Sequence, residues 1–242
     1  MLKGYVVVDL EMTGLHARTD RILEIGAVKI KEGKQENFHR MVNPRMEISK
    51  EVTELTGITN DMVKDGCEPE QAAAEFRDFA EGFPLVGHNL IFDYSFLKQC
   101  LVNHGETFEK DGIDTLKLAR KFLPEVEKKT LDYLCAYLQI ERSRNHRALE
   151  DAGATNLLFQ YLKEQFESQE PEAFWPKPLL YKVKKQGPAS ARQKKYLKEL
   201  ADWHKIDLNV ELDSLTRNEA SRITDKILRA YGKSSGVREG RL

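Results

Sequence analysis

The N-terminal third of the chain alternates short apolar runs with turns, which is the pattern of β-strands. Gly4–Leu10 is β-branched and short, and Ile22–Ile30 alternates apolar and polar positions. Glu36–Val42 follows the turn signal at Glu32-Gly33-Lys34. Three strands this close together, with no helix between them, predict an antiparallel meander.

After Asn43-Pro44 the apolar positions recur at the spacing of helices. Helices are predicted at Glu47–Leu55, Pro69–Phe83, Phe92–Asn103, Thr115–Phe122, Leu131–Leu138 and Arg147–Phe166. Pro84–Gly87 is short and apolar and lies between two helices, so it suits a central strand. Strands first, then strands and helices in alternation, predict an α/β fold with a mixed sheet flanked by helices.

The periodicity fades near Glu167, where prolines and glycines interrupt the chain. We expect a domain over residues 1–168, a Pro/Lys-rich linker over 169–189, a small helix-pair module over 190–232 and a flexible tail over 233–242. Ser190-Ala-Arg-Gln193 and Thr216-Arg-Asn-Glu219 have the form of capping boxes, so a helix is expected to begin at each. The second is expected to stop at Gly232.

Charge divides the chain in the same way. The 242 residues have a net charge of −1, but residues 1–168 have a net charge of −7 and residues 169–242 of +6. Apolar runs are too short to cross a bilayer, and the N-terminus has no signal-peptide pattern, so we expect a cytoplasmic protein with no membrane partner. Three separated cysteines indicate neither a disulfide framework nor a zinc site.

Two acids, Asp9 and Glu11, end the first strand. Side chains two apart on a strand point to the same face, so both carboxylates converge. They are either hydrated where the strand emerges into solvent or ligands of hard divalent cations, which prefer carboxylate oxygens.

Three further residues occupy comparable places. Asp93 lies in the first turn of an apolar helix, where capping is the simpler explanation. Asp151 lies near the start of a later helix, and His146 precedes that helix in a loop, where an ordinary surface role would also suit them.

Together, four acids and one histidine fall at the ends of elements expected to meet at one edge of a sheet. This predicts a site for metal-assisted hydrolysis with two Mg²⁺ or Mn²⁺ ions. Asp9 is best placed to bridge the ions, with Glu11, Asp93 and Asp151 each holding one or the other. His146 is the predicted general base, because an imidazole titrates near neutral pH.

With these residues, the sequence resembles the DnaQ-like (DEDDh) 3′–5′ exonucleases, which have a ribonuclease-H-like fold. The three motifs appear as Val8–Leu15, Gly87–Leu97 around Asp93, and His146–Ala152. Glu24–Ala27 and Thr56–Asn60 are also similar to the family, and the resemblance covers Leu2–Phe166. It implies that a nucleotide leaves the 3′ end of a nucleic acid as a 5′-monophosphate.

The resemblance also implies a substrate pocket. Thr13, Gly14 and Leu15 would form its floor, with Leu15 on the terminal base, although Thr13-Gly14 also suits a plain turn. His88 and Asn89 would brace the site, or His88 would be structural; Phe92 and Phe96 suit a pocket wall or the core. Met12 departs from the commoner threonine, and the string DLEMTG is shared with oligoribonucleases.

Residues 177–198 hold eight basic residues and no acid. The candidate nucleic-acid contacts are Lys182, Lys184, Lys185, Arg192, Lys194 and Lys195. Such cations neutralise phosphates, with aromatic neighbours stacking on bases, unless the segment is only a solvated linker.

The sequence as a whole predicts a metal-dependent exonuclease on single-stranded 3′ ends, of DNA in a proofreading or repair setting. A polymerase or another replication or repair protein is the expected partner. An oligoribonuclease-like enzyme on short RNA and a non-catalytic nucleic-acid-binding scaffold are the alternatives.

Overall fold

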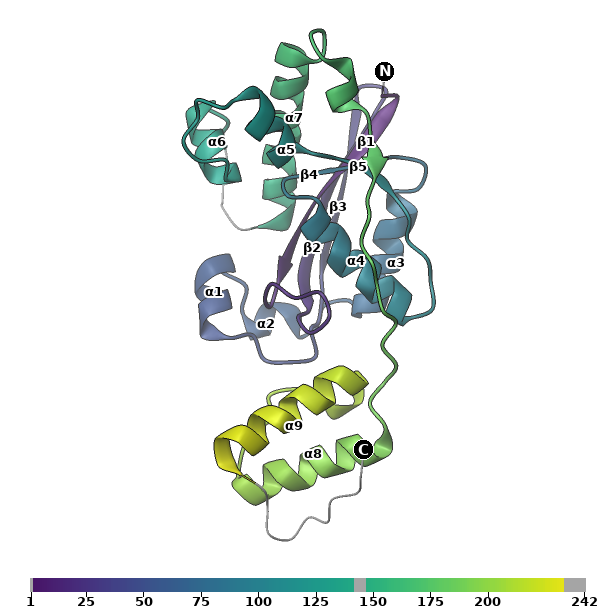
Figure 1. Cartoon of the computed structure of the whole chain (residues 1–242), viewed down its shortest axis with the longest axis vertical. Helices are drawn as coiled ribbons and strands as arrows, with labels where there is room; N and C mark the ends of the chain where they lie inside the picture. The colour runs from purple at the N-terminus through teal and green to yellow at the C-terminus, as the bar shows by residue number, and fades with distance from the viewer. Residues whose placement is uncertain (1, 142–146, 233–242) are drawn as a thin grey trace. The chain divides into compact units, whose positions relative to one another are not determined.

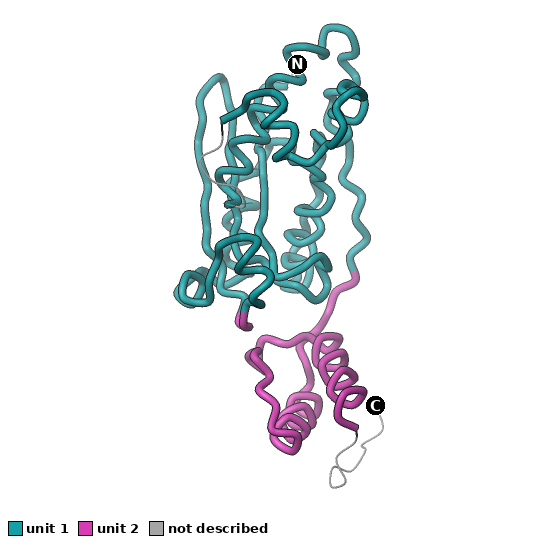
Figure 2. Tube along the Cα trace, turned by 90° about the vertical axis from the view of Figure 1, so that its left-hand side faces the viewer, with its two compact units in different colours: residues 1–44, 48–183 teal, residues 45–47, 184–242 magenta. Residues whose placement is uncertain are grey.

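The computed structural model describes residues 2–141 and 147–232, and the chain forms two compact units. The first comprises Met1–Pro44 and Ile48–Val183, and the second comprises Arg45–Glu47 and Lys184–Leu242 (Figure 2). The predicted domain boundaries at residues 168 and 189 remain a proposal.

The first unit is built on a sheet whose strand order is β3-β2-β1-β4-β5-β6 (Figure 1). The strands are β1 (Gly4–Met12), β2 (Ile22–Lys31), β3 (Lys34–Met41), β4 (Leu85–Gly87), β5 (Asp111–Asp114) and β6 (Lys177–Pro178). β1, β2 and β3 form the predicted antiparallel meander, β4 and β5 run parallel to β1, and β6 is antiparallel to β5. The predicted mixed sheet is therefore confirmed.

Helices cover both faces of this sheet. The helices of the first unit are α1 (Lys50–Thr56), α2 (Asn60–Val63), α3 (Pro69–Phe79), α4 (Ile91–Asn103), α5 (Thr115–Phe122), α6 (Leu131–Tyr137) and α7 (Ala148–Phe166). Figure 1 shows α3 and α4 on one side of the sheet and α5, α6 and α7 on the other. Among the helices within the described ranges, none has the length and apolar character needed to cross a membrane.

Successive side chains of β1 point to opposite faces of the sheet, which explains why an apolar cluster lies on each face. Val6, Val8 and Leu10 pack in the cluster that includes residues of α3 and α4. Tyr5 and Val7 point the other way, into the cluster that includes residues of α5, α6 and α7. Because side chains alternate, Asp9 and Glu11 lie on the face of Tyr5 and Val7, which is the face that α7 covers.

Some short elements were not predicted from the sequence. β5 is four residues long and α2 is one turn, both too short for periodicity to reveal. Within the expected linker, Pro171–Phe174 forms a 3₁₀ turn and Lys177–Pro178 pairs with β5. Proline is tolerated at β6 because that strand lies at the edge of the sheet.

Gly26 of β2 lies directly under the start of α7. A Cβ atom built on Gly26 would be 2.1 Å from the carbonyl carbon of Ala148 and from the backbone nitrogen of Leu149. Any larger residue would therefore push the helix away from the sheet. Gly26 faces Asp9 in the β1–β2 register, so this contact brings the first turn of α7 beside Asp9.

The second unit contains α8 (Ala191–His204), the 3₁₀ turn Leu212–Ser214 and α9 (Arg217–Tyr231). Both predicted capping boxes are present, at Ser190 and Thr216, and Gly232 ends α9 as expected. A small core holds the unit together, consisting of Ala189, Leu197, Leu200, Leu215, Ala220 and Ile227. Gln193 adds a polar link, because its Nε2 donates to the carbonyl of Arg217 and to Ser221 Oγ.

The Gly26 contact gives a testable prediction. Gly26→Ala is expected to lower the free energy of unfolding by about 1–3 kcal/mol, because the methyl group overpacks the helix–sheet contact. Gly153→Ala in α7 is the matched control. Its Cβ would meet nothing within 4 Å, so it is expected to stabilise the protein by about 0.5–1 kcal/mol. Urea unfolding measures both, and an unchanged midpoint for Gly26→Ala would contradict the packing argument.

Candidate metal centre and catalytic site

Three of the predicted carboxylates meet on one face of the sheet. Asp9 and Glu11 extend from β1, and Asp151 extends from the first turn of α7. One oxygen from each lies within 4.8 Å of the others. Glu11 and Asp151 are buried, at 9% and 7% exposure, and Asp9 is partly buried. Three oxygens at this separation are a donor set that suits a hard divalent cation.

Asp93, the fourth predicted acid, is next to this group but not one of its three members. It lies in the first turn of α4, and its Oδ1 accepts a hydrogen bond from the backbone N–H of Leu10 at 3.1 Å. The bond ties α4 to the segment of β1 between Asp9 and Glu11. Burial raises the pKa of Asp93 above its ordinary value.

His146, the predicted general base, lies outside the described residues. Its neighbour Arg147 is described and immediately precedes α7. The assignment of His146 therefore stays a prediction.

The acids crowd one another electrostatically. Burial, followed by the charges of Asp151, Glu24 and Asp93, raises the pKa of Glu11 to about 8, while the positive charge of Arg147 opposes the rise. Like charges this close favour either protonation or a bound cation. The donor set and its charge therefore fit the divalent metal predicted from the sequence.

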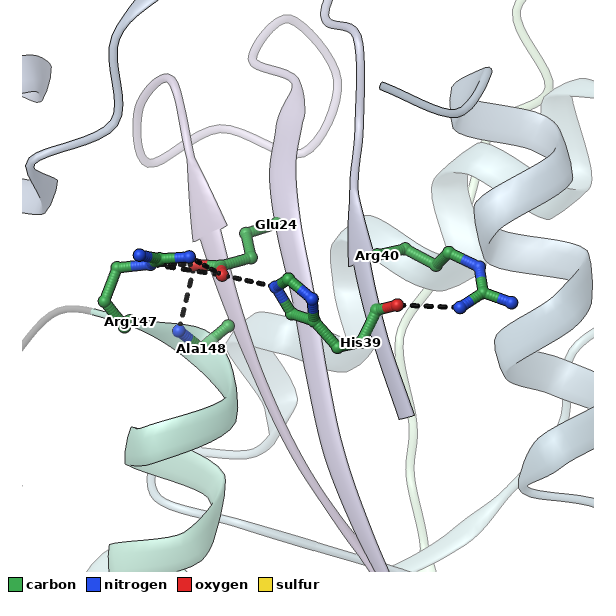
Figure 3. Close-up of polar contacts among 5 residues, drawn as sticks. All are labelled: Glu24, His39, Arg40, Arg147 and Ala148. Atoms are coloured by element: carbon green, nitrogen blue, oxygen red, sulfur yellow. Dashed lines mark hydrogen bonds and ion pairs between the residues drawn. The ribbon is translucent and has the colours of Figure 1, made fainter. Parts of the chain in front are cut away.

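Glu24 is a buried acid whose role the sequence did not reveal. It lies on β2 opposite Glu11 and is 1% exposed. Its oxygens accept bonds from Arg147 Nε and Nη2, from the backbone N–H of Ala148 and from His39 Nε2, at 2.7–3.2 Å (Figure 3). Burial raises the pKa of Glu24, but these bonds outweigh it and hold the pKa at about 2. A charged residue inside the apolar run Ile22–Val28 was the available signal.

The predicted pocket floor, Thr13 to Leu15, lies in the turn after β1, and Met12 is the last residue of that strand. The Thr13 N–H donates to the carbonyl of Arg21, and the Arg21 N–H donates to Thr13 Oγ1, each at 2.9 Å. Gly14 lies against Asp20, whose carboxylate would be 2.5 Å from a Cβ at that position. Leu15 is 75% exposed, and Met12 packs partly buried against the core. The turn is thus closed by its own bonds and presents Leu15 to solvent.

The residues predicted to brace the site have structural partners. His88 Nε2 lies 2.7 Å from the carbonyl oxygen of Lys129, and its Nδ1 lies 3.0 Å from Thr115 Oγ1. Burial lowers the pKa of His88. Asn89 adopts a φ of 67° and donates its N–H to Asp114.

The two phenylalanines of α4 pair with each other. Phe92 and Phe96 form an edge-to-face pair with ring centroids 5.4 Å apart. Phe96 is buried in the core and Phe92 packs against it. This arrangement suits a core or pocket wall better than a platform for stacked bases.

Lys194 and Lys195, which are candidate nucleic-acid contacts, form ion pairs within the protein. Lys194 Nζ lies 2.7 Å from Asp213 Oδ1, and Lys195 Nζ lies 3.8 Å from Glu199 Oε1. Lys182, Lys184, Lys185 and Arg192 have exposed side chains.

Comparison with known proteins points to nucleases. A model of the exonuclease family RNase_T matches residues 6–159. The PolC-type DNA polymerase III of Caldanaerobacter subterraneus subsp. tengcongensis is 42% identical over 164 residues, which are 67% of this chain and 12% of that polymerase. The PolC-type enzyme of Clostridium perfringens is 37% identical over 168 residues, again 67% of this chain and 12% of the enzyme. The chain therefore spans only a small part of the relatives that it matches.

Solved structures share the fold. Exonuclease X in complex with 5′ overhanging duplex DNA has a TM-score of 0.56 and 26% identity, covering 67% of this chain and 92% of that one. A zinc-bound complex of E. coli exonuclease I with single-stranded DNA has a TM-score of 0.58 and 19% identity, covering 85% of this chain and 44% of that one. The expected ribonuclease-H-like fold is confirmed.

The carboxylate cluster predicts that divalent cations stabilise the protein. Mn²⁺ at about 100 times its dissociation constant is expected to add about 2.7 kcal/mol to the free energy of unfolding. Thermal unfolding with Mn²⁺ and with chelator measures the shift. Asp151→Asn is expected to abolish it, whereas Asp225→Asn, which removes an exposed acid on α9, is expected to keep it. An equal Mn²⁺ shift in the Asp151→Asn protein would exclude this cluster as the binding site.

Proposed function

Because this chain belongs to the RNase_T exonuclease family, we propose that it removes nucleoside 5′-monophosphates one at a time from the 3′ ends of single-stranded DNA. The observation that carries the proposal is the convergence of Asp9, Glu11 and Asp151 on one face of the sheet. Family membership covers the exonuclease chemistry; the polarity, the substrate and the residue roles are proposals.

Two divalent ions, Mg²⁺ or Mn²⁺, are the proposed cofactors. Asp9, Glu11 and Asp151 would hold them, with Asp93 contributing from α4. When bound, such ions make a water more acidic and neutralise charge on the phosphodiester. The chain's own acids supply the oxygens and hold them in place through β1 and the first turn of α7.

The other residues of the proposed site would accept a proton from the attacking water or bind the 3′-terminal nucleotide. His146 would take the proton of the attacking water, since its ordinary pKa is near neutral. Gly14 would offer its backbone amide to the terminal nucleotide, and the exposed Leu15 would pack on its base. Thr13, whose own N–H is bonded to the carbonyl of Arg21, would hold the turn that forms this floor. His88 and Asn89 would support the strand end from the end of β4, with Phe92 as a wall.

DNA is the proposed substrate, and RNA is the alternative. The DNA-bound exonuclease X and the PolC-type relatives favour DNA. The DLEMTG string around Met12 favours an oligoribonuclease-like activity on short RNA. A scaffold that binds nucleic acid without cleaving it is a further alternative, and digestion of a labelled strand separates it from an enzyme.

A polymerase or another replication or repair protein is the proposed partner, with proofreading or end trimming in the cytoplasm as the setting. Support comes from the PolC-type polymerases, which contain a segment similar to this chain. The second unit would add a basic surface for the strand through Lys184, Lys185 and Arg192, and Lys182, near the end of the first unit, would contribute from the sequence just before it.

Digestion of a 5′-labelled strand tests the reaction. With Mn²⁺, the wild-type protein is expected to shorten single-stranded DNA in steps of one nucleotide, and chelator to stop it. Asp9→Asn and His146→Ala are expected to lower kcat by at least about 10²-fold, since each removes a ligand or a general base. A matched RNA strand of the same sequence is the second substrate. Faster digestion of RNA would replace the DNA assignment, and undiminished digestion by Asp9→Asn protein would overturn the proposed site.

Salt dependence tests the basic segment. Replacing Lys182, Lys185 and Arg192 with alanine is expected to reduce the slope of log binding constant against log salt by about 0.7 for each phosphate that the variant no longer neutralises. Lys194→Ala is the control, because Lys194 is already paired with Asp213. Fluorescence anisotropy with Asp9→Asn protein and a labelled strand measures the slope without digestion. If the triple variant keeps the wild-type slope, this segment does not contact the strand.

A further inference from the structure

Glu24 is a buried acid whose contacts the proposed reaction does not use. Its side chain is 1% exposed, lies beside Glu11 on the sheet, and accepts bonds at both carboxylate oxygens. With these lone pairs engaged by Arg147, Ala148 and His39, Glu24 is not a further member of the three-oxygen cluster. Its bonds instead lead to the helix that carries Asp151.

The first of these bonds fixes the start of α7. Ala148 is the first residue of α7, and its backbone N–H donates to Glu24 Oε2 at 3.1 Å. Arg147, at the N-cap position, makes no side-chain cap bond of its own. Glu24 therefore provides from the sheet the negative charge and the acceptor that helix N-termini need.

This cap is one turn away from Asp151. Residues three apart lie on neighbouring positions of a helix surface, so Ala148 and Asp151 share a side of α7. The Asp151 N–H closes the first helical bond, to the carbonyl of Arg147 at 2.9 Å. A shift of the first turn would move the Asp151 carboxylate with it.

The second bond fixes Arg147 beside the acids. Its guanidinium makes contacts with Glu24 at 2.8–3.2 Å, as Figure 3 shows, and its charge reaches Glu11. Arg147 also directly follows His146 in the sequence. The Glu24 carboxylate thus binds both the first N–H of α7 and the Arg147 guanidinium, whose positive charge acts on the three acids.

We propose that Glu24 is a positioning residue: through Ala148 and Arg147 it sets where Asp151 stands relative to Asp9 and Glu11, and so sets the affinity of the cluster for divalent metal. The inference rests on the proposed function, because it assigns these acids to metal binding. Mutation of residues that orient metal ligands typically lowers metal affinity or activity by about 10–100-fold.

Glu24→Gln in the whole 242-residue chain tests the inference. The amide keeps the shape but removes the charge and replaces one acceptor oxygen with a donor, which opposes the N–H groups of Arg147 and Ala148. Mn²⁺ affinity, read from the electron paramagnetic resonance signal of free Mn²⁺, is expected to weaken about 10–100-fold. At fixed Mn²⁺, kcat on single-stranded DNA is expected to fall while KM stays unchanged, and excess Mn²⁺ is expected to restore part of kcat.

Glu75→Gln is the matched control. Glu75 is also an acid bonded to an arginine, because it accepts from Arg40 Nε at 2.6 Å, but its bonds are to Arg40 and Gln71 and not to α7. The Glu75→Gln protein is expected to bind Mn²⁺ with wild-type affinity. A folded Glu24→Gln protein, as judged by circular dichroism, that binds Mn²⁺ as the wild type does would overturn the inference.

Arg147→Ala covers the case in which Glu24→Gln does not fold. It removes one of the two links and leaves the Ala148 bond, so a smaller loss of Mn²⁺ affinity is expected, and an unchanged affinity would equally overturn the inference. Asp9→Asn separates this failure from that of the proposed function. If Asp9→Asn abolishes digestion while Glu24→Gln and Arg147→Ala bind Mn²⁺ normally, only the positioning role fails.

Discussion

The approach of α7 to the sheet at Gly26 is the constraint on which the rest of the site depends. The helix backbone lies over this residue so closely that no side chain fits between them. Two residues earlier on the same face of β2, Glu24 accepts the first N–H of the helix. The contact at Gly26 is steric and sets how close the first turn of α7 lies to the sheet. The hydrogen bond to Glu24 is polar and sets which way that turn faces. The first turn of α7 sets the position of the Asp151 carboxylate. The alternation of side chains along β1 places Asp9 and Glu11 on the same face of the sheet.

Packing around the site stabilises the fold, whereas the charges of the site destabilise it. Apolar layers above and below β1 stabilise the sheet, whereas Asp9, Glu11 and Asp151 are brought together at a cost in mutual repulsion. Burial and this repulsion raise the pKa of Glu11, and the positive charge of Arg147 opposes the rise. Local conflict of this kind, inside an otherwise consistent fold, is typical of a functional site. The same crowding makes a divalent cation the natural occupant, which agrees with the family of nucleases to which the chain belongs.

Much of this arrangement could be read from the sequence because it is local. Apolar runs marked β1, β2 and β4, and a turn signal marked β3. The capping boxes at Ser190 and Thr216 marked the starts of α8 and α9. The convergence of Asp9 and Glu11 followed from the period of a strand. What the sequence could not reveal depends on distant partners: β5 and β6 pair although they lie far apart along the chain, and Glu24 acquires its role only when Arg147 and Ala148 reach it. Asp93 was predicted to join the group, but the hydrogen bond that it accepts from the Leu10 N–H could be seen only in the fold.

A crystal grown with Mn²⁺ and a deoxynucleoside 5′-monophosphate would test the account most directly. The anomalous difference map should show manganese bonded to oxygens of Asp9, Glu11 and Asp151, with the nucleotide phosphate on the open side of the metal and Glu24 still bonded to Ala148. Manganese bound elsewhere, with these three carboxylates apart and the nucleotide away from them, would contradict it.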